Sequence, residues 1–169
     1  MKNAASLLTS TLLCLFIGCI SSPEAQLEAN KSVVVRFNEA INSQQLDLLD
    51  GLVARDLVRH SQATPELDIR SLEEFKQFIQ QSLDTFPDTH QEINMMIAEG
   101  DKVAVYATFS GTQEGDMGPF PASGEQVSSQ FLGVLRLEEG KIAEIWVEWD
   151  NLSFLTQLGH FPLPQEDEQ

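Results

Sequence analysis

Carboxylates and an indole alternate along one segment near the C-terminal end of this sequence. Glu144, Trp146, Glu148 and Asp150 are two residues apart, and in a strand that spacing brings their side chains to one face. A carboxylate shielded from water holds its proton more tightly, as a group that removes a proton from carbon near neutral pH requires. The pattern therefore predicts general acid/base chemistry, with Asp150 as the base and with Trp146 and Glu148 beside the substrate.

A second interpretation of the same residues involves no chemistry. Asp150 directly precedes the segment 151–158, which has the pattern of a short helix, and Asp is a preferred N-cap residue. Glu144, Trp146 and Glu148 would then form a solvated face or part of a dimer interface. Both interpretations stay open at the level of the sequence.

His60 is the histidine best placed for chemistry. It ends a short extended segment, 57–60, and a histidine at the mouth of a pocket can orient a carbonyl group or transfer a proton. A loop histidine bonded to the backbone is the alternative. His90 begins a predicted strand and His160 lies in the C-terminal segment, so we expect neither to take part in chemistry.

No metal or coenzyme is expected, because the motifs that hold them are missing from the sequence. There is no pair of histidines at the helical spacing typical of zinc ligands, and no glycine-rich phosphate-binding motif. A Gly-x-Ser-x-Gly nucleophile turn is also missing. The two cysteines, Cys14 and Cys19, both lie in the N-terminal segment and suit neither a disulfide scaffold nor a zinc site.

Aromatic side chains provide the apolar surface that a small-molecule pocket needs. We expect Tyr106, Phe131 and Trp146, all on predicted strands, to line the pocket. Phe120 lies in a segment rich in Gly and Pro, 114–124, which predicts either a lid over the pocket or an exposed connection between strands.

The elements that must position these residues change type halfway along the chain. Apolar residues at helical spacing predict a helix over 27–41 and a short helical piece over 46–53. Ser71 and Glu74 form a capping box, and the helix that they open ends before Pro87. Alternating patterns then predict strands over 90–99, 103–113, 127–137 and 142–149.

Tight Gly-containing turns between successive strands predict antiparallel hairpins. Helices followed by such strands indicate an α+β fold, in which the N-terminal helices pack on one face of a curved antiparallel sheet. A curved sheet covered in this way forms a cone, and the interior of the cone is the predicted apolar pocket.

Composition limits the partners of this chain. It has 169 residues, with 10 Lys and Arg against 26 Asp and Glu, and a formal net charge of −16. Its length and its hydrophobic content of 42% fit one globular domain. Binding to nucleic acid backbones requires a basic surface, so no nucleic-acid partner is expected. A small hydrophobic ligand or substrate is the expected partner.

The N-terminal segment has the layout of an export signal. Lys2 precedes an apolar run that extends to Ile17. The sequence 16–19 resembles a bacterial lipobox, in which the cysteine is diacylated and becomes the mature N-terminus. We therefore expect lipidation of Cys19 and a membrane anchor on the extracytoplasmic side, as an exported bacterial lipoprotein. A plain signal peptide is the alternative.

The predicted organisation follows from these segments. After the signal peptide no apolar stretch is long enough for an internal transmembrane helix. The expected parts are a signal peptide over 1–18, a tether over 19–28, one domain over 29–161 and a flexible acidic tail over 162–169.

Several short motifs occur in a distinctive order within the predicted domain. They are His60, Phe86–Asp88, Ala98–Ala104, Ser110–Thr112, Gly140–Ile142 with Trp146 and Asp150, and Gln157–Gly159. In this order and spacing they resemble the SnoaL-like polyketide cyclases of the NTF2-like superfamily. The resemblance covers about residues 29–161, and it implies the same helix-covered, cone-shaped sheet.

The resemblance also implies a chemistry. In these cyclases an Asp at the end of the last strand is the general acid/base of an intramolecular aldol ring closure on an ester, without metal or coenzyme. Asp150 matches that position, and Arg136 falls where the cyclases carry an assisting histidine. Arg136 or His60 is then expected to stabilise the enolate oxygen. A homodimer formed through the sheet is a further implication.

Two functions are consistent with the sequence. One is a cofactor-independent cyclisation or isomerisation of a small apolar carbonyl compound. The other is a non-catalytic, membrane-anchored lipoprotein that binds a hydrophobic small molecule. The export signal favours an extracytoplasmic substrate or binding alone, since polyketide ring closure follows synthesis inside the cell.

Overall fold

The computed structural model describes residues 22–161. Helices come first and strands dominate the second half, as the sequence predicts. In chain order the elements are α1 (Pro23–Asn42), the short 3-10 turn η1 (Leu46–Leu48), α2 (Leu49–Leu52), β1 (Val53–His60), α3 (Leu72–Thr85), β2 (His90–Glu99), β3 (Lys102–Thr112), β4 (Gln126–Glu138), β5 (Lys141–Trp149) and α4 (Asn151–Gln157).

The five strands form one sheet in the order β1-β5-β4-β3-β2. The strands β2 to β5 pair as the antiparallel hairpins that the turns predict. The edge strand β1 pairs in parallel with β5, so that Arg59 lies opposite Ile145 and His60 opposite Trp146. This pairing brings residues 53–60 beside the last strand, although the two strands are far apart in the sequence. The α+β prediction of helices on a curved antiparallel sheet is confirmed, with the parallel pairing of β1 as a difference.

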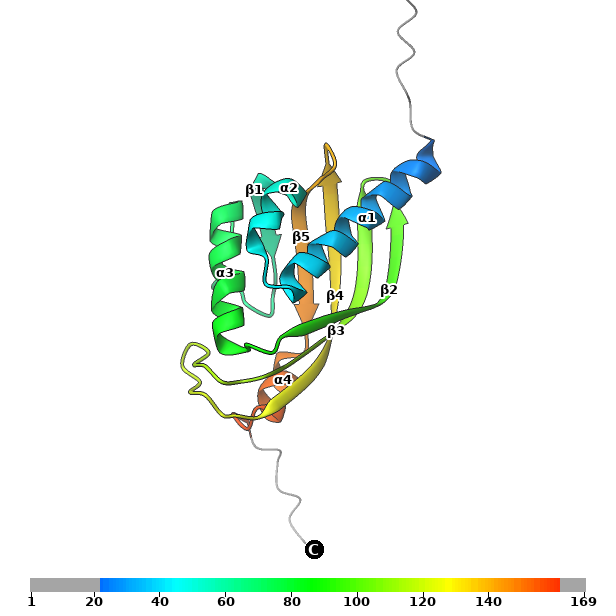
Figure 1. Cartoon of the computed structure of the whole chain (residues 1–169). Helices are drawn as coiled ribbons and strands as arrows, with labels where there is room; N and C mark the ends of the chain where they lie inside the picture. The colour runs from blue at the N-terminus through cyan, green and yellow to red at the C-terminus, as the bar shows by residue number, and fades with distance from the viewer. Residues whose placement is uncertain (1–21, 162–169) are drawn as a thin grey trace, which may run out of the picture.

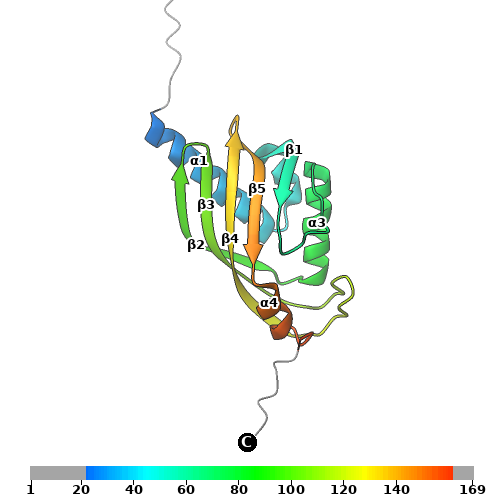
Figure 2. The same cartoon turned by 180° about the vertical axis from the view of Figure 1, so that it is seen from behind.

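Helices cover one face of this sheet. Figure 1 shows α1 crossing that face and α3 beside β1, and Figure 2, from behind, shows the opposite face with the strands in front of α1. Asparagine side chains fasten α1 to the sheet: Asn38 and Asn42 both donate to the carbonyl of Gln91 at the start of β2. The main hydrophobic core lies between these two layers.

The first helix begins earlier than the sequence analysis expects. The tether predicted over 19–28 is helical from Pro23 onward. Ser22 explains the start, because its side chain accepts a hydrogen bond from the Ala25 N–H at 3.2 Å, and Pro23 is favoured in the first turn of a helix. Within residues 22–161, α1 included, no helix is both long and apolar enough to cross a membrane.

The predicted capping box is confirmed with one difference. Ser71 Oγ accepts a hydrogen bond from the Glu74 N–H at 3.2 Å. The Glu74 carboxylate reaches back one residue further than expected and accepts the N–H of Arg70 at 2.8 Å. The helix α3 then ends at Thr85, ahead of Pro87, which has no N–H to continue it.

Candidate functional site

A cavity of about 970 Å³ lies between the covered face of the sheet and the helices. That size is at the upper end of the range for small-molecule sites. Its wall is mainly apolar, and all five strands of the sheet contribute to it together with α1, α3, α4, the loop after β1 and the segment 113–125. Representative lining residues are Phe37, Phe75, Phe78, Val105, Phe131 and Ile145.

Small residues in the sheet help to keep this space open. Ala107 on β3 and Gly133 on β4 both line the cavity, where longer side chains would enter it. Gly133 also allows close packing, because a Cβ at this position would lie 3.2 Å from Cγ2 of Val105. A strand interior seldom favours Gly, so Gly133 fits a position where the sheet leaves room for the contents of the cavity.

The side chains of β5 that face the cavity are not the set that the sequence analysis expected. Ile145, Val147 and Trp149 line the cavity. Glu144 and Trp146 alternate with them and lie on the uncovered face of the sheet. The physical reason is that a sheet covered on one face buries its apolar set, and alternation sends the charged set outward. The expectation that the carboxylate set faces the cavity is therefore corrected.

Asp150 lies at the end of this strand and caps α4. Its carboxylate accepts a hydrogen bond from the Ser153 N–H at 3.0 Å, and its side chain is exposed. Both of its chain neighbours, Trp149 and Asn151, line the cavity. Asn151 also donates to the carbonyl of Ala63 and so ties α4 to the loop after β1. Asp150 is thus an N-cap beside the cavity, and its role as a base stays a prediction.

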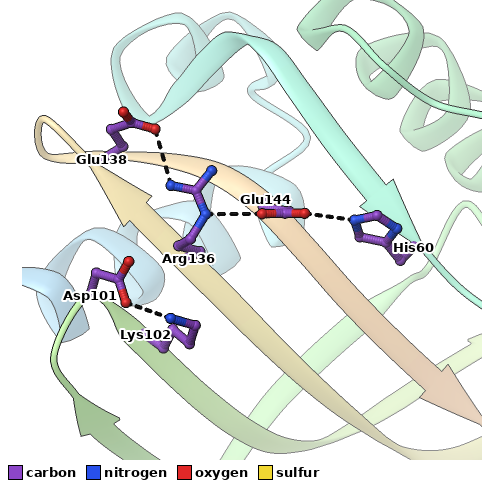
Figure 3. Close-up of polar contacts among 6 residues, drawn as sticks. All are labelled: His60, Asp101, Lys102, Arg136, Glu138 and Glu144. Carbon is purple, nitrogen blue, oxygen red and sulfur yellow. Dashed lines mark hydrogen bonds and ion pairs between the residues drawn. The ribbon is translucent and has the colours of Figure 1, made fainter.

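The other two predicted catalytic residues meet on the uncovered face, away from the cavity. His60 Nε2 lies 2.8 Å from Glu144, whose other oxygen accepts a hydrogen bond from Nε of Arg136 at 2.9 Å. Figure 3 shows this chain of contacts running from β1 across β5 to β4, with Glu138 as a second partner of Arg136. The hydrogen bonds from His60 and then from Arg136 lower the pKa of Glu144 below its ordinary value.

Only one of the four predicted binding residues, Phe131, lines the cavity. Tyr106 pairs with Leu132 in the sheet and shares its uncovered face. Trp146 stacks on His60 with ring centroids 5.1 Å apart. Glu148 accepts the N–H groups of residues 62 and 63 at 2.6 and 3.0 Å, and so holds the loop after β1. Tyr106, Trp146 and Glu148 therefore do not contact the cavity.

A charged residue that the sequence analysis did not select does line the cavity. Arg59, next to His60, points to the covered face, and only 5% of it is exposed. Its Nη1 donates to Thr64 Oγ1 at 3.0 Å, and its guanidinium carbon lies 4.7 Å from the ring centre of Phe78. The sequence held a signal for this placement: Arg59 is two residues after the buried Leu57, and alternate residues of a strand share a face.

The segment 113–125 is fastened across one end of the cavity. The fully buried Gln113 donates to the carbonyl groups of Gly115, Phe120 and Pro121, at 3.1 to 3.4 Å. Its carbonyl oxygen lies 2.8 Å from His160 Nε2, and the His160 ring packs at a tilt against Phe120, with ring centroids 4.8 Å apart. Phe120 lines the cavity. This segment therefore contributes to the wall of the cavity while much of it is exposed, so a role as a lid stays a prediction, and His160 has a structural contact.

Carboxylates occur only at the exposed edge of the cavity. Glu66, Asp84 and Asp116 contribute to the lining, and all three are exposed to solvent. Among residues 22–161 there is no cluster of three or more His, Cys, Asp or Glu side chains that would hold a metal ion. The candidate site is thus an apolar cavity with one buried cation and an acidic rim.

Comparisons with known proteins agree with this fold. The model of a family described as SnoaL-like polyketide cyclase matches residues 31–158. Among solved structures, TsrD from Streptomyces laurentii is 27% identical, with a TM-score of 0.71, over 79% of this chain and 97% of TsrD. No curated protein sequence matches at a significant level.

Two further structures carry names that concern activity. IdmH from Streptomyces antibioticus, a proposed polyketide cyclase, is 28% identical, with a TM-score of 0.68, over 77% of this chain and 98% of IdmH. AclR from Streptomyces galilaeus, a proposed hydroxylase, is 25% identical, with a TM-score of 0.70, over 80% of this chain and 99% of AclR.

Proposed function

Because the chain belongs to the SnoaL-like polyketide cyclase family, we propose that it binds a small, largely apolar carbonyl compound in the cavity between its sheet and its helices and has a cyclase-like role. The apolar cavity of about 970 Å³ is the observation that carries this proposal. Its volume and lining fit a ligand of several fused or linked rings better than a polar metabolite.

The proposed reaction is an intramolecular aldol ring closure or a related isomerisation. A base removes a proton from the carbon beside a carbonyl group, and the enolate then attacks a second carbonyl carbon of the same molecule. The new alkoxide takes a proton back, so the step needs no metal, coenzyme or oxidant. Asp150, beside the cavity, is the proposed base, and its second role as an N-cap makes the choice of variants important.

Ligand binding is tested first, by filling the cavity from the sheet. Ala107 is buried and lines the cavity, so Ala107→Leu adds carbon atoms where the ligand would lie. We expect the affinity for a neutral apolar probe, N-phenyl-1-naphthylamine, to fall by about tenfold or more, because bound ligand and new side chain compete for one space. The measurement is a fluorescence titration.

Ala104→Leu is the matched control for this experiment. Ala104 lies on the same strand, three residues earlier, and pairs with Val134 on the uncovered face. We expect this variant to bind the probe like the unmodified protein. Equal binding by Ala107→Leu and the unmodified protein, with both folded by circular dichroism, would show that the probe does not enter the cavity and would contradict the proposal.

A non-catalytic, lipid-anchored binding protein is the second candidate. Two observations favour it: the export signal of the sequence, and the capping bond of Asp150. Cys19, the proposed lipidation site, lies outside the described residues. Mass spectrometry of the mature N-terminus separates a diacylated Cys19 from plain signal cleavage. An anchored protein on the extracytoplasmic side would meet its ligand at or near the membrane.

We further propose that the uncovered face of the sheet pairs with a second copy of this chain. Apolar side chains lie in a row across it, since Met95 is opposite Tyr106 and Tyr106 is opposite Leu132. Ile97, two residues from Met95, extends the same face. Met95, Ile97 and Leu132 are between 54% and 60% exposed, which is unusual for large apolar residues in a row.

A further inference from the structure

The backbone of β1 fixes Arg59 so that its side chain enters the cavity. Arg59 lies opposite Ile145 in the parallel pairing with β5, and its N–H donates to the carbonyl of Ile69 at 3.0 Å. Because β5 on one side and Ile69 on the other hold this stretch of backbone, the side chain at position 59 cannot turn outward without breaking the strand. His60 takes the opposite face, in the outer network.

The guanidinium group of Arg59 has few partners in the protein. Among residues 22–161 its one side-chain hydrogen bond is from Nη1 to Thr64 Oγ1, and its flat face rests on the ring of Phe78. Within residues 22–161 no carboxylate lies at ion-pair distance from it. Burial lowers the pKa of Arg59, and the more distant carboxylates of Glu148 and Glu66 act in the opposite direction. The remaining N–H donors have no acceptor among the described residues; they are not fully enclosed by protein and reach the open space of the cavity.

A buried cation with so few partners is not explained by stability. Removing a guanidinium from water costs several kcal/mol, and well-packed apolar replacements of buried charges are often neutral or stabilising. The missing interaction is a negatively charged acceptor. A guanidinium presents parallel N–H groups at the spacing of the two oxygens of a carboxylate, and this pairing is among the strongest hydrogen-bonded contacts in proteins.

We infer that the ligand of this cavity is an apolar monocarboxylate whose carboxylate pairs with Arg59. The inference rests on the proposed function and narrows its substrate class from carbonyl compounds in general to carbonyl compounds that also carry one free carboxylate. The apolar lining receives the body of the ligand. The exposed carboxylates of Glu66, Asp84 and Asp116 repel a ligand carboxylate at the rim, so the orientation with the acid end inside is favoured.

Acids and their methyl esters test this inference, because each pair differs only in the negative charge. The probes are 2-naphthoate and decanoate with their methyl esters, titrated into the protein by calorimetry and followed by the fluorescence of Trp149 at the cavity wall. The variants are Arg59→Met, which keeps length and loses charge, and Arg59→Lys, which keeps charge. Arg55→Met is the matched control, since Arg55 is an exposed arginine on the same strand.

We expect the unmodified protein and Arg55→Met to bind each acid about tenfold or more tightly than its ester. Arg59→Met should lose this preference by weakening acid binding while ester binding stays unchanged, and Arg59→Lys should keep part of it. The melting temperature of Arg59→Met without ligand should be unchanged or higher, since a merely structural arginine would lower it on removal.

Three results would overturn the inference, and they distinguish a wrong role for Arg59 from a failure of the proposed function. If the unmodified protein binds esters as tightly as acids, or if Arg59→Met keeps the preference for acids, the pocket function stands and the role of Arg59 is wrong. If neither acids nor esters bind to the unmodified protein, the carboxylate inference and the proposed ligand class both fail.

Discussion

At the scale of single residues, adjacent side chains serve opposite faces of the sheet. Arg59 enters the cavity, while His60 joins Glu144 and Arg136 on the uncovered face. From the sequence, His60 and Arg136 were expected at the cavity, and Arg59 was not selected. In the structure His60 and Arg136 belong to an outer network that links three strands, and Arg59 is the buried cation beside the apolar wall. The outer network therefore acts on the stability of the sheet.

The pH dependence of stability reports on this outer network. The pKa of Glu144 is lowered in the folded protein by His60 and then by Arg136, so its charged form is favoured by folding. The contribution is complete above the unfolded carboxyl pKa of about 4.3 and is lost as the pH falls through the lower folded value. Because the network is partly exposed, Glu144→Gln should cost about 1 kcal/mol or less at pH 7.

The measurement for Glu144→Gln is urea denaturation at pH 7 and again at about pH 3, below the ordinary carboxyl pKa. We expect the difference from the unmodified protein to shrink at the lower pH. Glu138→Gln is the control, because Glu138 also contacts Arg136 but its side chain is 64% exposed. A difference for Glu144→Gln that stays the same at both pH values would contradict the assigned role of its charge.

At the scale of elements, α4 and the segment 113–125 complete one end of the cavity. The helix α4 contributes Phe154 to an aromatic cluster with Phe86 and Phe109, whose ring centroids are 5.4 to 5.9 Å apart. Leu158, just after the helix, is fully buried in the same cluster. The cap at Asp150 thus supports packing at the cavity wall as well as the helix itself.

Two variants of Asp150 separate its capping role from the proposed catalytic role. Asp150→Ala removes the bond to the Ser153 N–H and should lower the free energy of unfolding by about 0.5–2 kcal/mol. Asp150→Ser keeps a capping oxygen and should stay close to the unmodified protein. If Asp150 is also the base, Asp150→Ser should lose about 10²- to 10⁴-fold in turnover of any converted substrate without losing affinity.

Thermal denaturation and single-turnover assays measure these two effects separately. A stable Asp150→Ala would argue against the cap, whereas full turnover by Asp150→Ser would argue against the base.

Asp88 is a similar case of one side chain that joins two elements, because it links the turn after α3 to Thr112 on β3. Its carboxylate accepts both the N–H and the hydroxyl of Thr112, at 2.6 and 2.7 Å, which lowers the pKa of Asp88.

At the scale of the whole molecule, the two faces of one sheet have different tasks. The helices α1 and α3 cover one face and leave a cavity, and Figure 2 shows the other face with the strands in front of α1 and with α4 at its lower end. A monomer that exposes rows of apolar side chains beside an ordered polar network would be at risk of association. The proposed pairing of two copies through this face would be a closed arrangement that removes the exposed apolar area.

Oligomeric state tests that pairing. Leu132→Glu places a charge in the middle of the exposed apolar row and should shift the protein from dimer to monomer, because a buried unpaired carboxylate is costly. The measurement is sedimentation velocity over a range of concentrations. Leu152→Glu is the matched control, since Leu152 is 65% exposed on α4, and it should leave the dimer intact. A monomeric unmodified protein would contradict the proposed interface.

The family was identified from its resemblance in motifs spread over residues 29–161. Local patterns in the sequence were enough to predict the order of helices and strands, the capping box at Ser71 and the antiparallel hairpins. These features depend on neighbours within a few residues, and the alternation along β5 also separated its apolar set from its charged set. Which set faces the cavity was decided by packing: the helices cover the sheet, and the apolar set must turn toward them. The parallel pairing of β1 with β5 joins segments about 85 residues apart, beyond the reach of any local pattern. That pairing positions Arg59 in the cavity and His60 outside it, so the candidate site is a product of the tertiary structure.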